Sequence, residues 1–296
     1  PLTPPSFYFD RYMGLDLPQP VVGDWAPTVE PKKGQHPDAW FVNLDPETMR
    51  RCRAGYYGLM NHVDDQLARI LQFMRLRGLL NDTLILFTSD HGEQLGDHHL
   101  FRKTFPYEGS ARVPFLVYAP SWMGLARGVS SDAPVGLQDV MPTLLDAAGV
   151  PVPDGVTGRS VLPFLSPDFA PSRWRGSESA PGPPWDTKRS GRGEAPPWRD
   201  ALHSEHSGLY QVDLGWHALN DGRTKYIWYS QTGREQLFAL DTDPHELHDL
   251  AGEADAESRL APWRRRMIEQ LRRRPEGFTD GERLVVGRPH QQLVPR

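Results

Sequence analysis

Two short apolar runs flank a loop rich in ionisable side chains, and this segment, residues 84–120, constrains the fold most strongly. The first run, LILFT at 84–88, is too short for a buried helix and is typical of a strand buried on both faces. It stops at SDHG (89–92), and a second apolar run follows at 113–118. Open α/β sheets hold their ligands beyond the carboxyl ends of such strands. The segment therefore predicts an α/β fold with a ligand site in the loop.

The loop itself concentrates groups that bind ions and carry protons. Such a density of charge between two core strands is not typical of a plain surface loop, and we expect a functional site here. The groups are three histidines, several acids and two cations: His91, His98, His99, Asp90, Asp97, Glu93, Glu108, Arg102 and Lys103.

Helices are predicted on both sides of this segment. Apolar residues recur at three- and four-residue steps over 46–77, which predicts a long amphipathic helix that Gly78 ends. A shorter helix is expected over 138–148, with Asp139 as its cap. A helix followed by two apolar strands makes parallel pairing of those strands the default. Residues 1–44 show little periodicity and are expected to form an extended surface loop.

The C-terminal third predicts a small antiparallel sheet of about four strands, with an Arg-rich amphipathic helix over 255–274 packed on it. The strands are expected at 200–205, 215–219, 224–229 and 236–240. A stretch rich in Pro, Gly and Ser over 166–198 cannot bury much apolar surface. We therefore expect a catalytic α/β part at 1–165, an insertion or linker at 166–198, and an α+β subdomain with a tail at 199–296.

Composition excludes some classes of function. The 296 residues include 33 Lys and Arg against 38 Asp and Glu, without a basic tract, so nucleic acid is not an expected partner. No apolar run approaches the roughly 20 residues of a membrane-spanning helix. The single cysteine, Cys52, allows no internal disulfide. That favours a cytoplasmic location while leaving the periplasm and secretion open.

Several motifs match one family in order and spacing. The strand that ends in Ser-Asp-His-Gly is followed by Lys103, then YEG at 107–109 and RVP at 112–114. The helix before this strand and the stretches 138–160 and 225–246 agree as well. Together they resemble the sulfatases of the alkaline phosphatase superfamily. A bare Asp-His-Gly also occurs in phosphodiesterases and phosphomutases of that superfamily, but the ordered set is specific.

The resemblance implies an alkaline-phosphatase-like sandwich with a mostly parallel central sheet, incomplete here, plus a small C-terminal antiparallel sheet packed with a helix. It implies hydrolysis of sulfate esters through a metal-bound formylglycine hydrate. One divalent metal is expected, Ca²⁺ first, with Mg²⁺ or Mn²⁺ as alternatives. The esterified alcohol, whether aryl, sugar or choline-like, and the oligomeric state stay open.

The resemblance also assigns residues. Asp90 and His91 are expected to hold the metal, and Lys103 to contact the sulfuryl oxygens as a catalytic and substrate-binding cation. His98, or else its neighbour His99, is expected to contact substrate or the leaving oxygen, with His98 as the catalytic choice; a loop histidine with a backbone partner is the alternative. By the same resemblance, His203 and His206 are expected to line the substrate pocket. Apart from the resemblance, we expect an ion pair between Glu108 and Arg112, and core rather than pocket-rim positions for Trp216 and His217.

The family's nucleophile is absent from this sequence. Formylglycine arises within C-x-P-S-R or S-x-P-x-R, and Cys52 lies in RRCRAGYY instead. We therefore expect a C-terminal portion that is inactive alone, needs the N-terminal portion of the same enzyme as a partner, and aggregates through exposed sheet edges. Two alternatives remain. One is a phosphonate monoester or phosphodiester hydrolase of the same superfamily, and the other is a truncated, non-catalytic module.

Overall fold

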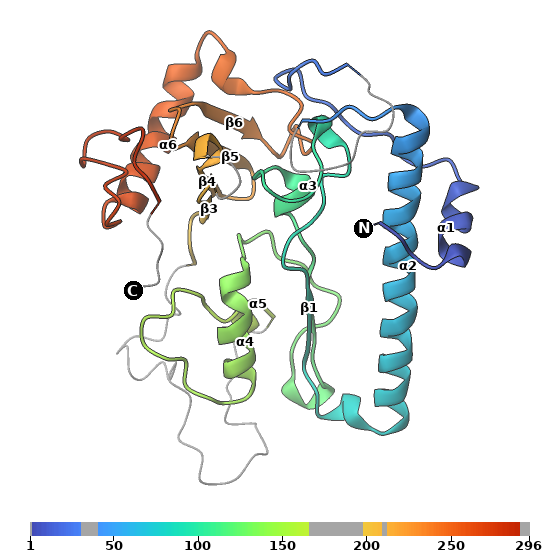
Figure 1. Ribbon diagram of the computed structural model, residues 1–296. Helices are drawn as coiled ribbons and strands as arrows, with labels where there is room; N and C mark the ends of the chain where they lie inside the picture. The colour runs from blue at the N-terminus through green and yellow to red at the C-terminus, as the bar shows by residue number, and fades with distance from the viewer. Residues whose placement is uncertain (1, 31–40, 166–197, 209–211, 291–296) are drawn as a thin grey trace. The chain divides into compact units, whose positions relative to one another are not determined.

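The structure, a computed structural model, describes residues 2–30, 41–165, 198–208 and 212–290 (Figure 1). These residues form two compact units. Unit 1 comprises Pro1–Met60, His91–Arg112 and Asp200–Arg296, and unit 2 comprises Asn61–Asp90 and Val113–Arg199. The helices are α1 (Ser6–Met13), α2 (Pro46–Leu76), α3 (Glu108–Ala111), α4 (Val140–Ala147), α5 (Leu162–Leu165) and α6 (Ala256–Leu271), and the strands are β1 (Ile85–Thr88), β2 (Phe115–Tyr118), β3 (Leu202–His206), β4 (Trp216–Asn220), β5 (Thr224–Tyr229) and β6 (Glu235–Ala239).

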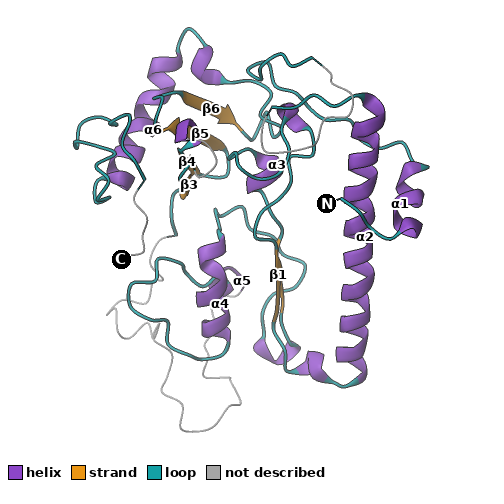
Figure 2. Cartoon of the chain, viewed as in Figure 1, coloured by secondary structure: helices purple, strands orange, loops and turns teal. Residues whose placement is uncertain are grey.

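Unit 1 is built around the four-stranded antiparallel sheet predicted from the sequence, with strand order β3-β4-β5-β6 (Figure 2). The registers place Glu205 opposite His217 and Trp216 opposite Tyr229. Because side chains alternate along a strand, the sheet has two distinct faces. The predicted strands and the C-terminal helix are confirmed.

The two faces of this sheet are covered by different parts of unit 1. On the helix face, apolar residues such as Leu219, Tyr226 and Trp228 pack with Trp263 and Met267 of α6. On the loop face, the apolar partners come from the loop of the ionisable residues: Leu100, Phe105 and Tyr107 pack with Trp216, Ala218, Ile227, Tyr229 and Phe238. The sheet is therefore the support on which the loop 91–112 is built.

Unit 2 contains β1 and β2, which pair antiparallel, with Ile85 opposite Tyr118 and Phe87 opposite Leu116. The expectation of parallel pairing was wrong. Parallel neighbours need a crossover of a dozen or more residues, usually a helix, and the segment between these strands holds only the four-residue α3 as α-helix. Burial on both faces was also wrong, because Phe87 and Leu116 are 39% and 60% exposed.

The predicted helix over 46–77 is confirmed as α2. Asp45 Oδ1 accepts a hydrogen bond from the Thr48 N–H at 3.1 Å, and Gly78 follows the helix with φ +70°. The first part of α2 contributes buried residues such as Met49 and Ala54, whereas beyond residue 60 the helix has none. No helix among the described residues is long and apolar enough to cross a membrane.

Three other expectations need comment. Residues 6–13 form α1 rather than extended loop; the Tyr12 ring stacks on Tyr57 at 5.8 Å, a contact that periodicity does not predict. Asp139 directly precedes α4, but its carboxylate makes no cap bond to that helix and instead pairs with Arg199. Most of the expected linker, 166–197, lies outside the described residues, so the three-part division stays a prediction.

Candidate active site

The loop 91–112 begins with a close backbone approach that only glycine permits. The Gly92 N–H donates to the Ser110 carbonyl at 2.8 Å. A Cβ on Gly92 would lie 2.3 Å from the Gly109 carbonyl oxygen, well inside van der Waals contact. This explains the glycine of the Asp-His-Gly motif physically, since a side chain there would push the two ends of the loop apart.

The middle of the loop stores backbone strain. Leu95, His98, His99 and Arg102 all have φ between 50° and 65°, a left-handed conformation that non-glycine residues rarely adopt. Glu93 holds this segment together, because its Oε1 accepts hydrogen bonds from the backbone N–H groups of Leu95 and Arg102. Such strain persists only where surrounding contacts enforce it, and it clusters at functional sites.

The His98 side chain is buried beneath the loop and is held by a backbone contact. It is 2% exposed, and its Nδ1 accepts a hydrogen bond from the Gly23 N–H at 3.1 Å. Burial lowers the pKa of His98 to about 4, so the imidazole is neutral at pH 7. The backbone partner is the alternative that the sequence left open, and a catalytic role for His98 stays a prediction.

A buried lysine that sequence reasoning did not single out fastens the loop to the sheet. Lys225 of β5, 2% exposed, donates from Nζ to Glu108 Oε1 at 2.6 Å, to Glu246 Oε1 at 2.8 Å and to the Pro106 carbonyl at 2.9 Å. Burial alone would lower its pKa, but Glu246 and Glu108 outweigh burial and raise the pKa of Lys225. The sequence signal that could have identified Lys225 is its position within the mostly apolar strand TKYIWY.

The expected ion pair of the loop exists but is peripheral. Arg112 Nη1 lies 4.0 Å from Glu108 Oε2, and the arginine side chain is 73% exposed. A pair at this distance with one partner exposed to solvent stabilises little. The principal partner of Glu108 is therefore Lys225.

The expected metal ligands are neighbours in sequence, at the point where the chain passes from unit 2 to unit 1. Asp90 is exposed and is the last residue of its segment in unit 2, and His91 is the first of its segment in unit 1. His91 Nδ1 lies 2.8 Å from the Gly92 carbonyl, which can only accept, so Nδ1 carries a proton, and in the neutral ring Nε2 is the nitrogen with the lone pair. A carboxylate, together with an imidazole whose Nδ1 is held by a carbonyl, fits a divalent cation. Lys103 is exposed in the loop of unit 1.

The two histidines of β3 lie on opposite faces of the sheet. His206 is on the loop face, where its ring stacks on Trp216 with centroids 6.1 Å apart. His203 is on the helix face and stacks on His217 at 5.4 Å. One pocket on a single face cannot take both side chains. Trp216 and His217 are buried, as expected, with exposed fractions of 7% and 0%.

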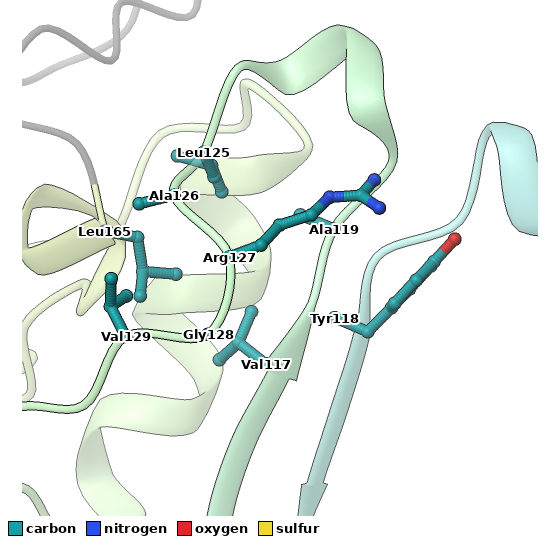
Figure 3. Close-up of a pocket in the computed structure, with 9 residues that line it drawn as sticks. All are labelled: Val117, Tyr118, Ala119, Leu125, Ala126, Arg127, Gly128, Val129 and Leu165. Atoms are coloured by element: carbon teal, nitrogen blue, oxygen red, sulfur yellow. The ribbon is translucent and has the colours of Figure 1, made fainter.

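Two other features are poor candidates for the site. A hollow of about 260 Å³ in unit 2 is lined mainly by apolar residues, from Val117 to Leu165, and Arg127 is the one charged residue among them (Figure 3). Cys52 packs partly buried beside a core cluster, and burial raises the pKa of its thiol. A raised pKa makes a thiol a weaker nucleophile at neutral pH.

Comparisons with known proteins agree with this geometry. The Sulfatase family model matches residues 24–150. An arylsulfatase of Clostridium perfringens is 38% identical over 296 residues, which is 99% of this chain and 55% of the relative. A multifunctional alkaline phosphatase superfamily protein of Trinickia caryophylli is 30% identical, over 94% of this chain and 57% of the relative. The chain thus spans a little over half the length of these relatives.

One solved structure is informative for the fold and the site. The phosphonate monoester hydrolase of Silicibacter pomeroyi matches with a TM-score of 0.61 and 27% identity, over 84% of this chain and 47% of that structure. The small antiparallel sheet with its helix, the glycine-dependent loop and the four matches have one common explanation. The chain belongs to the sulfatase family of the alkaline phosphatase superfamily.

Proposed function

We propose that this chain supplies part of the active site of a sulfuric ester hydrolase. The observation that carries the proposal is the strained loop 91–112, fastened by Lys225 and Glu93, which holds the His91 imidazole in one tautomer and presents Lys103 to solvent. The match to an arylsulfatase along nearly the whole chain supports sulfate rather than another ester.

Asp90 and His91 would hold the metal, with a carboxylate oxygen and imidazole Nε2 as ligands. The hard oxygen donor suits Ca²⁺, Mg²⁺ or Mn²⁺, and Ca²⁺ is the first choice. A bound divalent ion would neutralise a sulfate oxygen and acidify a hydrate nucleophile.

Lys103 would bind the sulfuryl oxygens and stabilise the charge that grows on the ester as the S–O bond breaks. His206 lies on the sheet face that carries the loop, which makes it the better candidate of the two β3 histidines for contact with the rest of the substrate. His98, neutral and held by Gly23, would contribute mainly by fixing the loop's shape, and a proton transfer through it remains part of the proposal.

The nucleophile would come from residues outside this chain, because the sequence contains neither C-x-P-S-R nor S-x-P-x-R. The exposed apolar face of unit 2 supports this view. Phe87, Leu116 and Tyr118 lie at paired or neighbouring positions on one face of the β1–β2 ribbon and are 39–60% exposed. In a complete catalytic domain, further strands and helices would cover such a face.

Hydrolysis of phosphonate monoesters or phosphodiesters is the second candidate, favoured by the 27% identity to a phosphonate monoester hydrolase. The test is the ratio of kcat/KM for 4-nitrophenyl sulfate and bis(4-nitrophenyl) phosphate, measured on this chain combined with the N-terminal portion that we expect as its partner, after expression with formylglycine-generating enzyme. We expect the sulfate to be the better substrate. A clear preference for the phosphodiester would replace the proposal with the second candidate.

A further inference from the structure

Three metal-ligating side chains converge on the helix face of the four-stranded sheet, away from the loop 91–112. His203 and Glu205 are two residues apart on β3 and therefore share a face. The register of β3 and β4 places His217 directly opposite Glu205. His217 is fully buried, and Glu205 is partly open to solvent, with 32% of its side chain exposed.

The distances among the three groups are those of ligands around one small ion. His217 Nδ1 lies 3.2 Å from His203 Nε2 and 3.3 Å from Glu205 Oε2, and one ligand atom of each residue lies within 4.8 Å of the others. In a tetrahedral Zn²⁺ site with bonds of 2.0–2.1 Å, neighbouring ligand atoms are about 3.3 Å apart. The two distances from His217 Nδ1 therefore match two edges of such a tetrahedron.

Hydrogen bonding alone does not satisfy this cluster. The Nδ1 atom of His217 carries at most one proton, which points mainly to one of its two neighbours. Without a proton, its lone pair faces a carboxylate oxygen of Glu205 that can only accept. A cation between the three atoms would be bound by all of them.

Neighbouring side chains orient the cluster as outer partners orient metal ligands. Arg274 Nη1 donates to Glu205 Oε1 at 2.9 Å, so the other carboxylate oxygen, Oε2, is directed at His217. The charge of Arg274 is itself balanced by Glu276, with contacts of 2.8 and 3.1 Å. The His290 ring stacks on His217 with centroids 5.2 Å apart and closes that side of the cluster.

We propose that His203 Nε2, His217 Nδ1 and Glu205 Oε2 bind a Zn²⁺ ion that ties β3 to β4. Two imidazoles and one carboxylate are a zinc donor set with a fourth position left for water, whereas Ca²⁺ takes six to eight oxygens. This site is separate from the expected ligands Asp90 and His91. It does not rest on the proposed sulfatase activity, and it assigns His203 to a metal rather than to substrate.

Zinc titration of the metal-stripped 296-residue chain tests the proposal, with excess Ca²⁺ present to occupy oxygen-rich sites. We expect one Zn²⁺ per chain by calorimetry and a rise in the unfolding temperature with zinc concentration. Co²⁺ used in place of Zn²⁺ should give the intense visible absorption of a tetrahedral ion.

Variants on the two faces of β3 provide matched controls. Glu205→Gln and His203→Asn should each weaken zinc binding by more than the roughly 10–100-fold that loss of an outer partner costs, and Arg274→Gln should fall in that lower range. His206→Asn, on the opposite face, should bind zinc as the unmodified chain does. No zinc bound by the folded chain, or equal affinity in Glu205→Gln and His206→Asn, would overturn the site.

Discussion

The two sheets of this chain differ in how completely their side chains are buried. In unit 1, the β3–β6 sheet is covered by α6 on one face and by the loop 91–112 on the other, and Tyr226, Ile227 and Phe238 are fully buried. In unit 2, one face of the β1–β2 ribbon packs on a small core around Leu162, while the other exposes large apolar side chains such as Leu116. A sheet with two covered faces can hold a strained loop in place, whereas a ribbon with one bare face needs a partner.

Lys225→Met should produce the largest effect, because it breaks the contact between loop and sheet on which unit 1 depends. The substitution leaves Glu246, 1% exposed, without its cation. Removing one partner of a buried ion pair costs about 3–5 kcal/mol. We expect the free energy of unfolding, measured by urea unfolding, to fall by an amount in that range.

The matched control for Lys225→Met is Arg112→Met, which removes the exposed partner of Glu108 and should change stability by less than about 1 kcal/mol. A loss below about 1 kcal/mol for Lys225→Met itself would mean that the buried lysine does not fasten the loop.

Arg199→Met tests whether a buried ion pair also stabilises unit 2. Asp139 is fully buried, and both of its carboxylate oxygens accept hydrogen bonds from Arg199 as well as from the backbone N–H groups of Gly136 and Arg159. The two backbone hydrogen bonds persist in the variant. We therefore expect the free energy of unfolding to fall by about 3 kcal/mol, the low end of the range for a broken buried ion pair. Hydrogen exchange of the α4 amides measures it, and unchanged protection there would contradict the prediction.

The pH dependence of stability should reveal the buried imidazole beneath the loop. The folded-state pKa of His98 is about 4 and the unfolded value is 6.5, so the unfolded chain binds the proton first as pH falls. Stability should be full above pH 6.5, fall by about 3 kcal/mol toward pH 4 and then level off with respect to this group.

His98→Gln should remove that part of the decline, and His248→Gln should leave it, because His248 is exposed beside Asp24, which raises its pKa and gives the opposite sign. Identical pH profiles for His98→Gln and the unmodified chain would show that His98 is not the group responsible.

Leu116→Lys should have the smallest effect on folding. Leu116 is 60% exposed on the bare face of unit 2, so the change in the free energy of unfolding of the chain should be within about 0.5 kcal/mol. The same substitution should reduce aggregation, which light scattering measures, because it places a charge on an apolar strand. A loss above about 2 kcal/mol would show that this face is packed after all.

Local patterns predicted most of the fold. The antiparallel strands and α2 follow from turn signals and from a helical stripe of apolar residues. Contacts between distant residues could not be predicted from the sequence. Tyr12 of α1 stacks on Tyr57, and Asp139 pairs with Arg199, sixty residues away. The pairing of β1 with β2 depends on the loop between them, whose glycine contact and left-handed residues leave no periodic signature.

For the site, the sequence placed the chemistry in the right loop but did not reveal its support. Lys225 lies in a strand, where a lysine is ordinarily exposed, and only the tertiary fold buries it between two carboxylates. The separation of His203 from His206 was available in the sequence, since a spacing of three places two strand residues on opposite faces. How Asp90, His91 and Lys103 act together remains a prediction.

We propose that the supported loop of unit 1 carries a catalytic cation, and the kinetics of Lys103→Ala test this, measured on the chain combined with the N-terminal portion that we expect as its partner. We predict that kcat for 4-nitrophenyl sulfate falls about 10²–10³-fold, the cost of losing one charge-stabilising donor. Arg112→Ala, an exposed cation of the same loop, should leave kcat within about threefold. Equal, small changes in both variants would contradict the account.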